Sequence, residues 1–208
     1  AALTAMLSHH HRMGLDDVSA HTLDPAALTL LAHLTVELAP AGVDTPTFVA
    51  PDGDADLLAA VAALRGEPGT AALPPLDDLA ARRARRTLLA NGWDLVDTAE
   101  DDGLVVPPEG STVLLHLPSA TRRNITDTEI VDTLSALEAT LPADARAIVV
   151  GPGGVLCGRL PSALQSARAT VLRSGRVRVI LRLPAGLWPA RPRQGLGVWI
   201  LGPGAGDV

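Results

Sequence analysis

The sequence predicts an α/β fold in which helices cover both faces of a doubly wound, mostly parallel sheet of about seven strands. Strand-like apolar runs alternate with helical segments of 10–15 residues, which is the pattern of a parallel sheet with helical crossovers. The 208 residues are 47% apolar, enough for one core and short of two comfortable ones. The final two apolar runs have no helix between them, so we expect an antiparallel pair at one edge.

The first half of the chain supplies three helices and three strands. Residues 25–39 predict an amphipathic helix, because Pro25 follows Asp24 at a first helical position and Leu28, Leu31, Leu34 and Leu38 fall on one face. The elements expected after it are a short strand at 46–50, a helix at about 56–65, a weak strand at 70–73, a helix at 76–91 and a poor strand at 93–97.

The second half begins after a Pro/Gly-rich connection at 103–110, which leads to an apolar strand at 112–117. Thr126 with Glu129 forms a capping box and predicts a helix over 127–140. The segment Gly151-Pro152-Gly153-Gly154 has neither the P-loop nor the dinucleotide-binding spacing, so it predicts a tight strand-to-helix connection. The remaining expected elements are a strand at 145–150, a helix at 160–173, and strands at 176–183 and 195–201.

The expected organisation is an N-terminal segment (1–24), one domain (25–203) and a short tail or linker (204–208). The chain begins at Ala rather than Met, which indicates a segment of a longer protein. Its apolar runs are shorter than a membrane span and its N-terminus lacks a signal-peptide pattern, so we expect a cytoplasmic protein with no membrane partner.

Composition excludes several kinds of chemistry. All 17 basic residues are Arg, so no lysine can form a Schiff base or serve a P-loop. The single Cys157 excludes a disulfide within the chain and a Cys-based metal site. The adjacent histidines at 9–11 are not spaced as metal ligands, and we expect no metal. Aromatic residues are 2% of the chain and fall in or beside the expected strands: Phe48, Trp93, Trp188 and Trp199.

The loop at 49–58 is the most informative candidate site. In an open α/β sheet, ligands bind beyond the carboxyl ends of the strands, and a glycine there permits close approach of the backbone. Gly53 lies among Asp52, Asp54 and Asp56, whose carboxylates would repel phosphates. The loop therefore favours a phosphate-free ligand with a cationic centre, of which S-adenosylmethionine is one. The arginines at 82, 83, 85 and 86 spread over more than one helical face and are expected to be mainly solvated.

Taken in order, these elements resemble the N-6 adenine DNA methylases, the modification-subunit type of restriction–modification systems. The resemblance covers about residues 25–203 and is most specific over 144–202, in ARAIVVGPGGVLCGRL and the following LRSGRVRVILRLPAGLWP. It implies a class I methyltransferase-like (Rossmann-like) fold, S-adenosylmethionine as cofactor, and DNA, other subunits or missing flanking domains as partners.

The resemblance also places a cofactor crevice. Alignment on the pair Leu57-Leu58 puts the two family glycines at Gly53 and Ala55, while the family Asp-Pro pair falls on Val49 and Ala50. The acidic residue of the family falls near the prolines at 74–75. The cofactor-binding residues that this alignment implies are Val49, Asp52, Gly53, Asp54 and Ala55, with Asp77 as the nearest carboxylate for a ribose.

The catalytic Asn-Pro-Pro-aromatic loop of the family falls on Leu117, Pro118, Ser119 and Ala120. In that family the Asn holds the amino group of a flipped adenine and the aromatic ring stacks on the base. Leu117 has no side-chain acceptor and Ala120 has no ring, so the loop is degenerate. Arg122 and Arg123 follow it, either as contacts to DNA phosphates or as an exposed loop.

Two interpretations follow from this loop. The favoured one is a diverged, catalytically silent domain that serves as a scaffold or partner contact in a restriction–modification or defence-type complex. The other is an adenine methylase that works with an altered loop. A small-molecule binder without phosphate is a third, more general possibility, because fold resemblance alone does not decide function.

Overall fold

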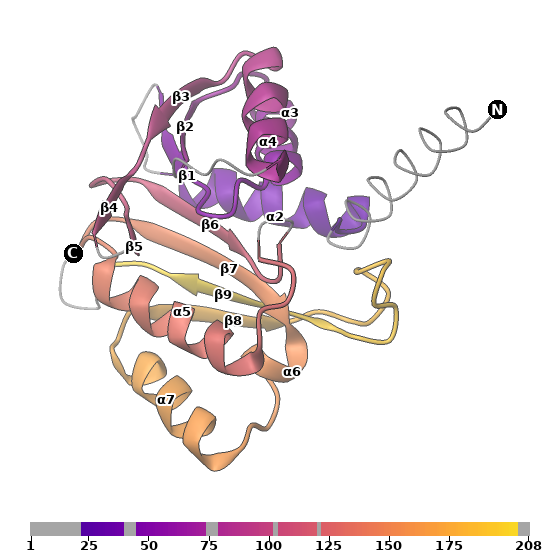
Figure 1. Cartoon of the computed structure of the whole chain (residues 1–208), viewed down its shortest axis with the longest axis vertical. Helices are drawn as coiled ribbons and strands as arrows, with labels where there is room; N and C mark the ends of the chain where they lie inside the picture. The colour runs from indigo at the N-terminus through magenta and orange to yellow at the C-terminus, as the bar shows by residue number, and fades with distance from the viewer. Residues whose placement is uncertain (1–21, 40–44, 74–78, 102–103, 120–121, 204–208) are drawn as a thin grey trace.

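The computed structural model of the chain describes residues 22–39, 45–73, 79–101, 104–119 and 122–203 (Figure 1). Seven strands form one sheet in the order β3-β2-β1-β6-β7-β9-β8. Their bounds are β1 (Thr47–Val49), β2 (Thr70–Leu73), β3 (Asp94–Asp97), β6 (Thr112–His116), β7 (Arg146–Pro152), β8 (Val177–Arg182) and β9 (Leu196–Leu201). The number of strands in the main sheet is the one expected from the sequence.

The sheet is parallel from β3 to β7 and antiparallel at its other edge. Strand β9 pairs antiparallel with both β7 and β8, so the last strand of the sheet in chain order is inserted between two earlier ones. This confirms the expected antiparallel edge pair. A second, two-stranded ladder joins β4 (Ala99–Asp101) to β5 (Leu104–Val106).

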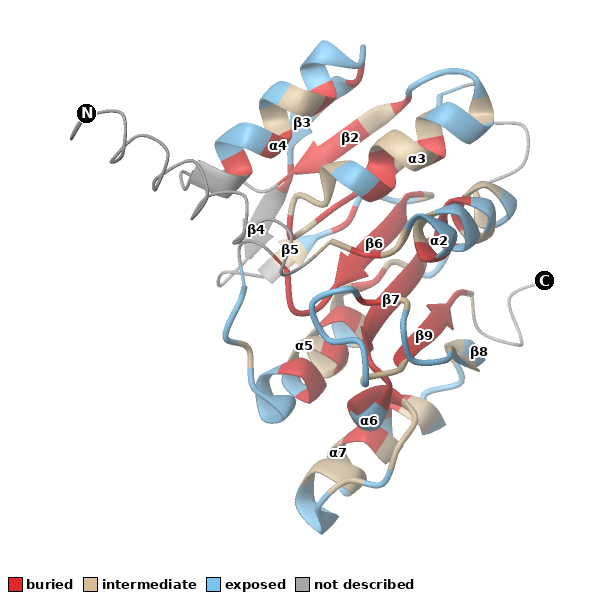
Figure 2. Ribbon diagram, turned by 90° about the vertical axis from the view of Figure 1, so that its right-hand side faces the viewer, coloured by how far each residue is buried: buried red, intermediate tan, exposed pale blue. Residues whose placement is uncertain are grey.

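Helices cover both faces of the sheet, as Figure 2 shows with the buried central strands between helices that are only partly exposed. One face packs against α2 (Pro25–Leu38), α3 (Ala55–Arg65) and α4 (Leu79–Ala90). The other packs against α5 (Asp127–Thr140), α6 (Gly153–Leu156) and α7 (Ser162–Arg173). The doubly wound arrangement follows from strands whose residues are buried on both sides, such as the fully buried β6.

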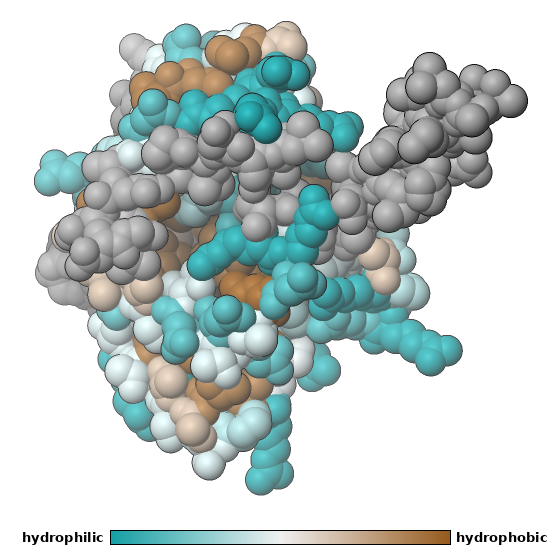
Figure 3. Space-filling model, viewed as in Figure 1, coloured by the Kyte–Doolittle hydropathy of each residue, from teal (hydrophilic) through white to brown (hydrophobic). Residues whose placement is uncertain are grey.

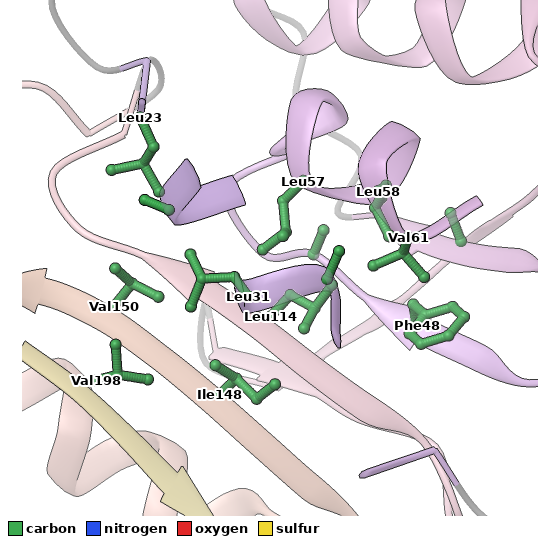
Figure 4. Packing of buried hydrophobic residues seen from close by; sticks show 14 of the residues in the cluster. Leu23, Leu31, Phe48, Leu57, Leu58, Val61, Leu114, Ile148, Val150 and Val198 are labelled. Atoms are coloured by element: carbon green, nitrogen blue, oxygen red, sulfur yellow. The ribbon is translucent and has the colours of Figure 1, made fainter. Parts of the chain in front are cut away.

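The first face of the core is built almost entirely from aliphatic side chains (Figure 4). Leu31 from α2 and Leu57 from α3 pack toward the strands, where they meet Phe48, Leu114 and Ile148. These side chains are 0–1% exposed. Burial of each large aliphatic side chain stabilises the fold by about 1.5–3 kcal/mol, so this layer fixes the position of α3 over β1.

Helix boundaries follow local sequence signals. The Asp24 carboxylate accepts a hydrogen bond from the Ala26 N–H at 2.9 Å, with Pro25 at the first helical position of α2. Thr126 and Glu129 form the predicted capping box of α5: the Glu129 N–H donates to Thr126 Oγ1 at 3.3 Å and the Thr126 N–H donates to Glu129 Oε2 at 2.7 Å.

The structure corrects the sequence prediction in the connecting segments. The expected connection at 103–110 contains β5, and the strand expected to end at 117 ends at His116. Strand β7 continues to Pro152, and α6, which was not expected, begins at Gly153. The tight strand-to-helix connection is confirmed. A Cβ atom on Gly153 would lie 2.9 Å from the Gly195 carbonyl oxygen, so close backbone approach requires glycine there.

Within the described residues, no helix is both long enough and apolar enough to cross a membrane. In Figure 3, the described part of the visible face shows apolar residues in separate small patches among polar ones.

Candidate functional site: an acidic pocket at the switch point of the sheet

The strand order reverses between β1 and β6. Strand β1 pairs with β2 on one side and with β6 on the other, although β6 comes five strands later in the chain. Helix α3 follows β1 on one face of the sheet and α5 follows β6 on the other. The crevice at the carboxyl ends of two such strands is where open α/β sheets bind ligands.

The turn after β1 is held by backbone geometry. The Gly53 N–H donates to the Ala50 carbonyl at 2.9 Å, and Gly53 has φ +65°, a left-handed conformation that favours glycine. Asp54 follows as the N-cap of α3, and its carboxylate accepts from the Leu57 N–H at 3.1 Å. The turn therefore brings the Asp52 and Asp54 carboxyl groups to the amino end of α3.

A pocket of about 250 Å³ lies at this point, and we call it the acidic pocket. Its lining comes from the start of α2, the turn after β1, α4 and the end of β6: Thr22, Leu23, Leu28, Asp52, Gly53, Asp54, Ala55, Asp56, Arg83, Ala84, Thr87, His116 and Ser119. Three carboxylates face one arginine here, so the pocket favours cationic and hydroxyl-bearing groups over phosphate.

His116 connects the two loops of the pocket. Its Nδ1 lies 3.2 Å from Asp54 Oδ2, and its ring lies 6.0 Å from that of Trp188 between ring centroids. His116 is only 3% exposed. No motif in the sequence indicates a partner for His116, because Asp54 lies 62 positions earlier and the two residues meet only once β1 and β6 are neighbours.

The carboxyl groups of the pocket have different proton affinities. Burial raises the pKa of Asp52 to about 7, against the opposing charges of Arg122 and His116. Burial acts in the same direction on Asp54, but its hydrogen bond to His116, the charge of His116 and the backbone N–H groups of Leu57 and Asp56 bring its pKa below the usual value. Burial and the neighbouring Asp54 raise the pKa of Asp56. One buried carboxyl group therefore changes charge near neutral pH.

The expected cofactor residues are only partly brought together. Asp52, Gly53, Asp54 and Ala55 all line the acidic pocket. Val49 does not, because its fully buried side chain belongs to the core cluster on the α5 face. The candidate ribose carboxylate, Asp77, lies outside the described residues.

The degenerate loop after β6 has a clear structural role at its first position. The Leu117 side chain is fully buried in the α5-face cluster, and its N–H donates to the Val150 carbonyl at 2.9 Å. The Leu117–Pro118 peptide bond is cis. Ser119 is 4% exposed, lines the pocket and hydrogen-bonds Asp52. Ala120 lies outside the described residues.

Arg122 and Arg123 are both exposed. The Arg122 N–H donates to Ser119 Oγ at 3.1 Å and its guanidinium donates to Thr133 Oγ1 at 3.4 Å. Its charge also acts on the pKa of Asp52, so Arg122 is electrostatically coupled to the pocket. Contact of either arginine with DNA stays a prediction.

The arginines of α4 do occupy more than one face. Arg82, Arg83 and Arg86 are exposed, as expected for a solvated helix face. Arg85 differs, because its guanidinium lies 2.6 Å from Asp97 Oδ1 and holds α4 to the end of β3. Arg83 reaches the acidic pocket and lowers the pKa of Asp56.

No aromatic ring is available to stack on a base. The one Phe and three Trp residues of the chain are 0–2% exposed. Trp93 and Trp199 lie beside or in strands as expected, whereas Trp188 lies in the connection between β8 and β9. Among the described residues, no group of three His, Cys, Asp or Glu side chains is arranged to hold a metal ion.

No known family model matches the sequence, and no curated protein matches it significantly. Solved structures do match the fold. The methyltransferase subunit of a type I restriction–modification system from Streptococcus thermophilus has a TM-score of 0.65 and 16% identity, over 88% of this chain and 44% of that chain. A class I S-adenosylmethionine-dependent methyltransferase candidate from Listeria monocytogenes has a TM-score of 0.63 and 16% identity, over 91% of this chain and 63% of that chain.

The 23S rRNA methyltransferase ErmE has a TM-score of 0.55 and 21% identity, over 88% of this chain and 69% of that chain. This chain thus spans less than half of the first of these structures and less than two thirds of the second. At such identities the likeness establishes the fold, which is the class I methyltransferase-like fold predicted from the sequence.

Proposed function

We propose, from a fold shared with class I S-adenosylmethionine-dependent methyltransferases, that this domain binds S-adenosylmethionine in the acidic pocket and has lost DNA adenine N-6 methylation. The observation that carries the proposal is the position of the pocket, at the carboxyl ends of β1 and β6 with Gly53 in the first turn. This is the crevice in which open α/β sheets hold nucleoside ligands.

The side chains of the pocket fit the chemistry of this cofactor. S-adenosylmethionine carries a sulfonium and an ammonium group, has ribose hydroxyls and lacks phosphate. The carboxyl groups of Asp52 and Asp54 can accept hydrogen bonds from hydroxyl and ammonium groups. A buried carboxylate also stabilises a nearby positive charge more strongly than an exposed one does, because the effective dielectric constant is lower. When bound, the cofactor would supply an electrophilic methyl group.

Loss of adenine methylation is inferred from the loop after β6. The residue at the Asn position is Leu117, and its side chain points into the core rather than toward a substrate. All aromatic side chains of the protein are buried, so none can stack on a flipped adenine. The loop therefore keeps its structural role but lacks the hydrogen-bond acceptor and the ring.

Calorimetric titration at pH 8, where Asp52 is ionised, tests the binding proposal. We expect S-adenosylmethionine to bind about tenfold more tightly than S-adenosylhomocysteine, because only the former carries the sulfonium charge. Asp52→Asn should remove most of this preference. Asp94→Asn, an exposed carboxylate on the distant strand β3, should leave it unchanged.

Absence of binding at millimolar ligand would contradict the proposal. It would favour the second candidate function, a non-catalytic scaffold in a restriction–modification or defence-type complex, which the buried Leu117 supports. Methyl transfer to DNA adenine by the unmodified protein would instead contradict the loss of activity. The proposal also includes DNA, other subunits or flanking domains as partners, which pull-down experiments test. It further includes a cytoplasmic location, which cell fractionation tests.

A further inference from the structure

The charges of this protein are strongly segregated along the chain. Residues 145–203 contain nine arginines and no Asp or Glu, whereas residues 1–144 contain eight arginines and 22 acidic residues. The overall charge of −6 hides this division. The basic part comprises β7, α6, α7, β8 and β9, which lie together at the antiparallel edge of the sheet (Figure 1).

Two of these nine arginines have structural roles. Arg168 donates to the Val155 and Gly158 carbonyls, and Arg176 donates to the Leu141 and Pro142 carbonyls. A third, Arg146, is half-buried at the start of β7. The other six are exposed, and we call them the arginine edge: Arg159, Arg173, Arg178, Arg182, Arg191 and Arg193. Among the described residues, no carboxylate forms an ion pair with any of them.

The fold brings parts of the arginine edge together. Arg178 and Arg182 lie on β8, the outermost strand, about 13 Å apart along an extended chain. Burial raises the pKa of the Cys157 thiol and the charge of Arg182 lowers it, so Arg182 lies close to Cys157. Arg159 follows Cys157 by two residues in the chain. The connection that leaves β8 carries Arg191, whose guanidinium lies 4.6 Å from the centre of the Trp188 ring. Stacking of this kind holds the charged group in a fixed position.

Protection of an edge strand does not account for this pattern. Charged side chains on an edge strand discourage pairing with other strands, and Arg178 and Arg182 can serve this role on β8. The other four exposed arginines lie outside β8, so edge protection does not explain them. Solvated surfaces ordinarily mix both signs of charge, whereas residues 145–203 contain no Asp or Glu at all. A concentration of exposed guanidinium groups matches the bidentate recognition of phosphate.

We propose that the arginine edge, centred on β8, binds the phosphate backbone of duplex nucleic acid without reading its sequence. The absence of an exposed aromatic ring disfavours single strands, which such proteins bind largely by stacking. Strand β8 lies two strands beyond β7, whereas the acidic pocket lies between β1 and β6, so a test of the β8 arginines does not depend on cofactor binding. Arg191 differs from them, because it stacks on Trp188, whose ring neighbours that of His116 in the pocket lining.

Fluorescence anisotropy of the 208-residue chain with a labelled duplex DNA of about 20 base pairs tests the proposal. We expect affinity to fall with salt between about 50 and 200 mM, with a log–log slope of roughly −0.9 for each phosphate contacted. The double variant Arg178→Gln/Arg182→Gln should weaken binding about tenfold at low salt and reduce the slope by about two. Neither side chain is buried, so the variant should fold, which a thermal melt verifies.

The matched control is Arg82→Gln/Arg86→Gln, two exposed arginines of the acidic half, and it should leave binding unchanged. Four results would overturn the proposal: no duplex binding at about 50 mM salt, equal binding of single strands, loss of binding only in Arg122→Gln/Arg123→Gln, or binding to anionic vesicles but not to DNA. Light scattering could instead show a salt-sensitive dimer that the double variant abolishes, without any DNA binding. That result would mean that the arginine edge binds the acidic half of a second copy of the chain.

Discussion

At the scale of single residues, the sequence locates the acidic turn but not the partnerships within it. The run Asp52-Gly53-Asp54 is visible as a candidate site because a glycine among carboxylates follows a short strand. What the sequence lacks is the link from Asp54 to His116, since that contact depends on β1 and β6 being neighbours in the sheet. The elevated pKa of Asp52 depends likewise on burial, which no local pattern encodes.

The pKa of Asp52 predicts a specific dependence of stability on pH. The folded protein holds this proton up to about pH 7, while an unfolded chain releases it near 3.8. The folded state therefore binds more protons between these values, and the unfolding free energy falls as pH rises from about 4 to 7. Asp52→Asn removes this decline, so at pH 8 it should raise the melting temperature on the order of 5 °C and change it little at pH 4.

Thermal melts from pH 4 to 8 check this prediction. Asp94→Asn is the control, because Asp94 is exposed on β3 and should show no such difference. A constant difference between Asp52→Asn and the unmodified protein across the whole range would mean that the Asp52 proton is not coupled to folding.

At the scale of elements, prediction succeeds where the signal is local. Thr126 and Glu129 define the start of α5 within one turn of helix, and Pro25 after Asp24 defines α2 in the same way. The β4–β5 hairpin escapes prediction because its strands have three residues each and show no alternation. Helix α6 escapes because four residues carry no helical period.

Loss of the capping box should destabilise the protein measurably. Thr126→Ala removes the acceptor for the Glu129 N–H and the hydroxyl that donates to Glu129 Oε2, while the Thr126 N–H can still donate to that carboxylate. The loss costs about 1 kcal/mol and lowers the melting temperature by about 2–4 °C. Thr128→Ala in the same turn is exposed and makes neither bond, so it should have little effect. Equal effects of the two substitutions in chemical denaturation would show that the cap does not contribute.

At the scale of the whole molecule, the class of the sheet is the part that a single sequence conveys best, and side-chain contacts are the part that it conveys least. Alternation of element types is enough to predict a doubly wound sheet with an antiparallel pair at one edge. It does not predict that Trp188, in the connection between β8 and β9, is fully buried against His116 of β6.

Trp188 should therefore contribute to global stability although it lies in a connection. The neighbouring Leu187 carbonyl accepts from the Asp24 N–H at 3.0 Å, so this connection joins the start of α2 to the end of β6. Trp188→Ala should cost about 3–5 kcal/mol in urea unfolding, as for other buried Trp residues. Trp188→Phe should recover much of this loss, and an alanine variant as stable as the unmodified protein would contradict the assignment.

The position of β9 has a consequence for assembly of the sheet. Among the described strands, β8 pairs with β9 alone, yet β9 follows β8 in the chain across a connection of 13 residues. During synthesis β8 therefore remains unpaired until β9 has left the ribosome, and the sheet cannot extend strand by strand in the order of translation. Removal of β9 leaves two sets of unsatisfied backbone groups at once, those of β7 and those of β8.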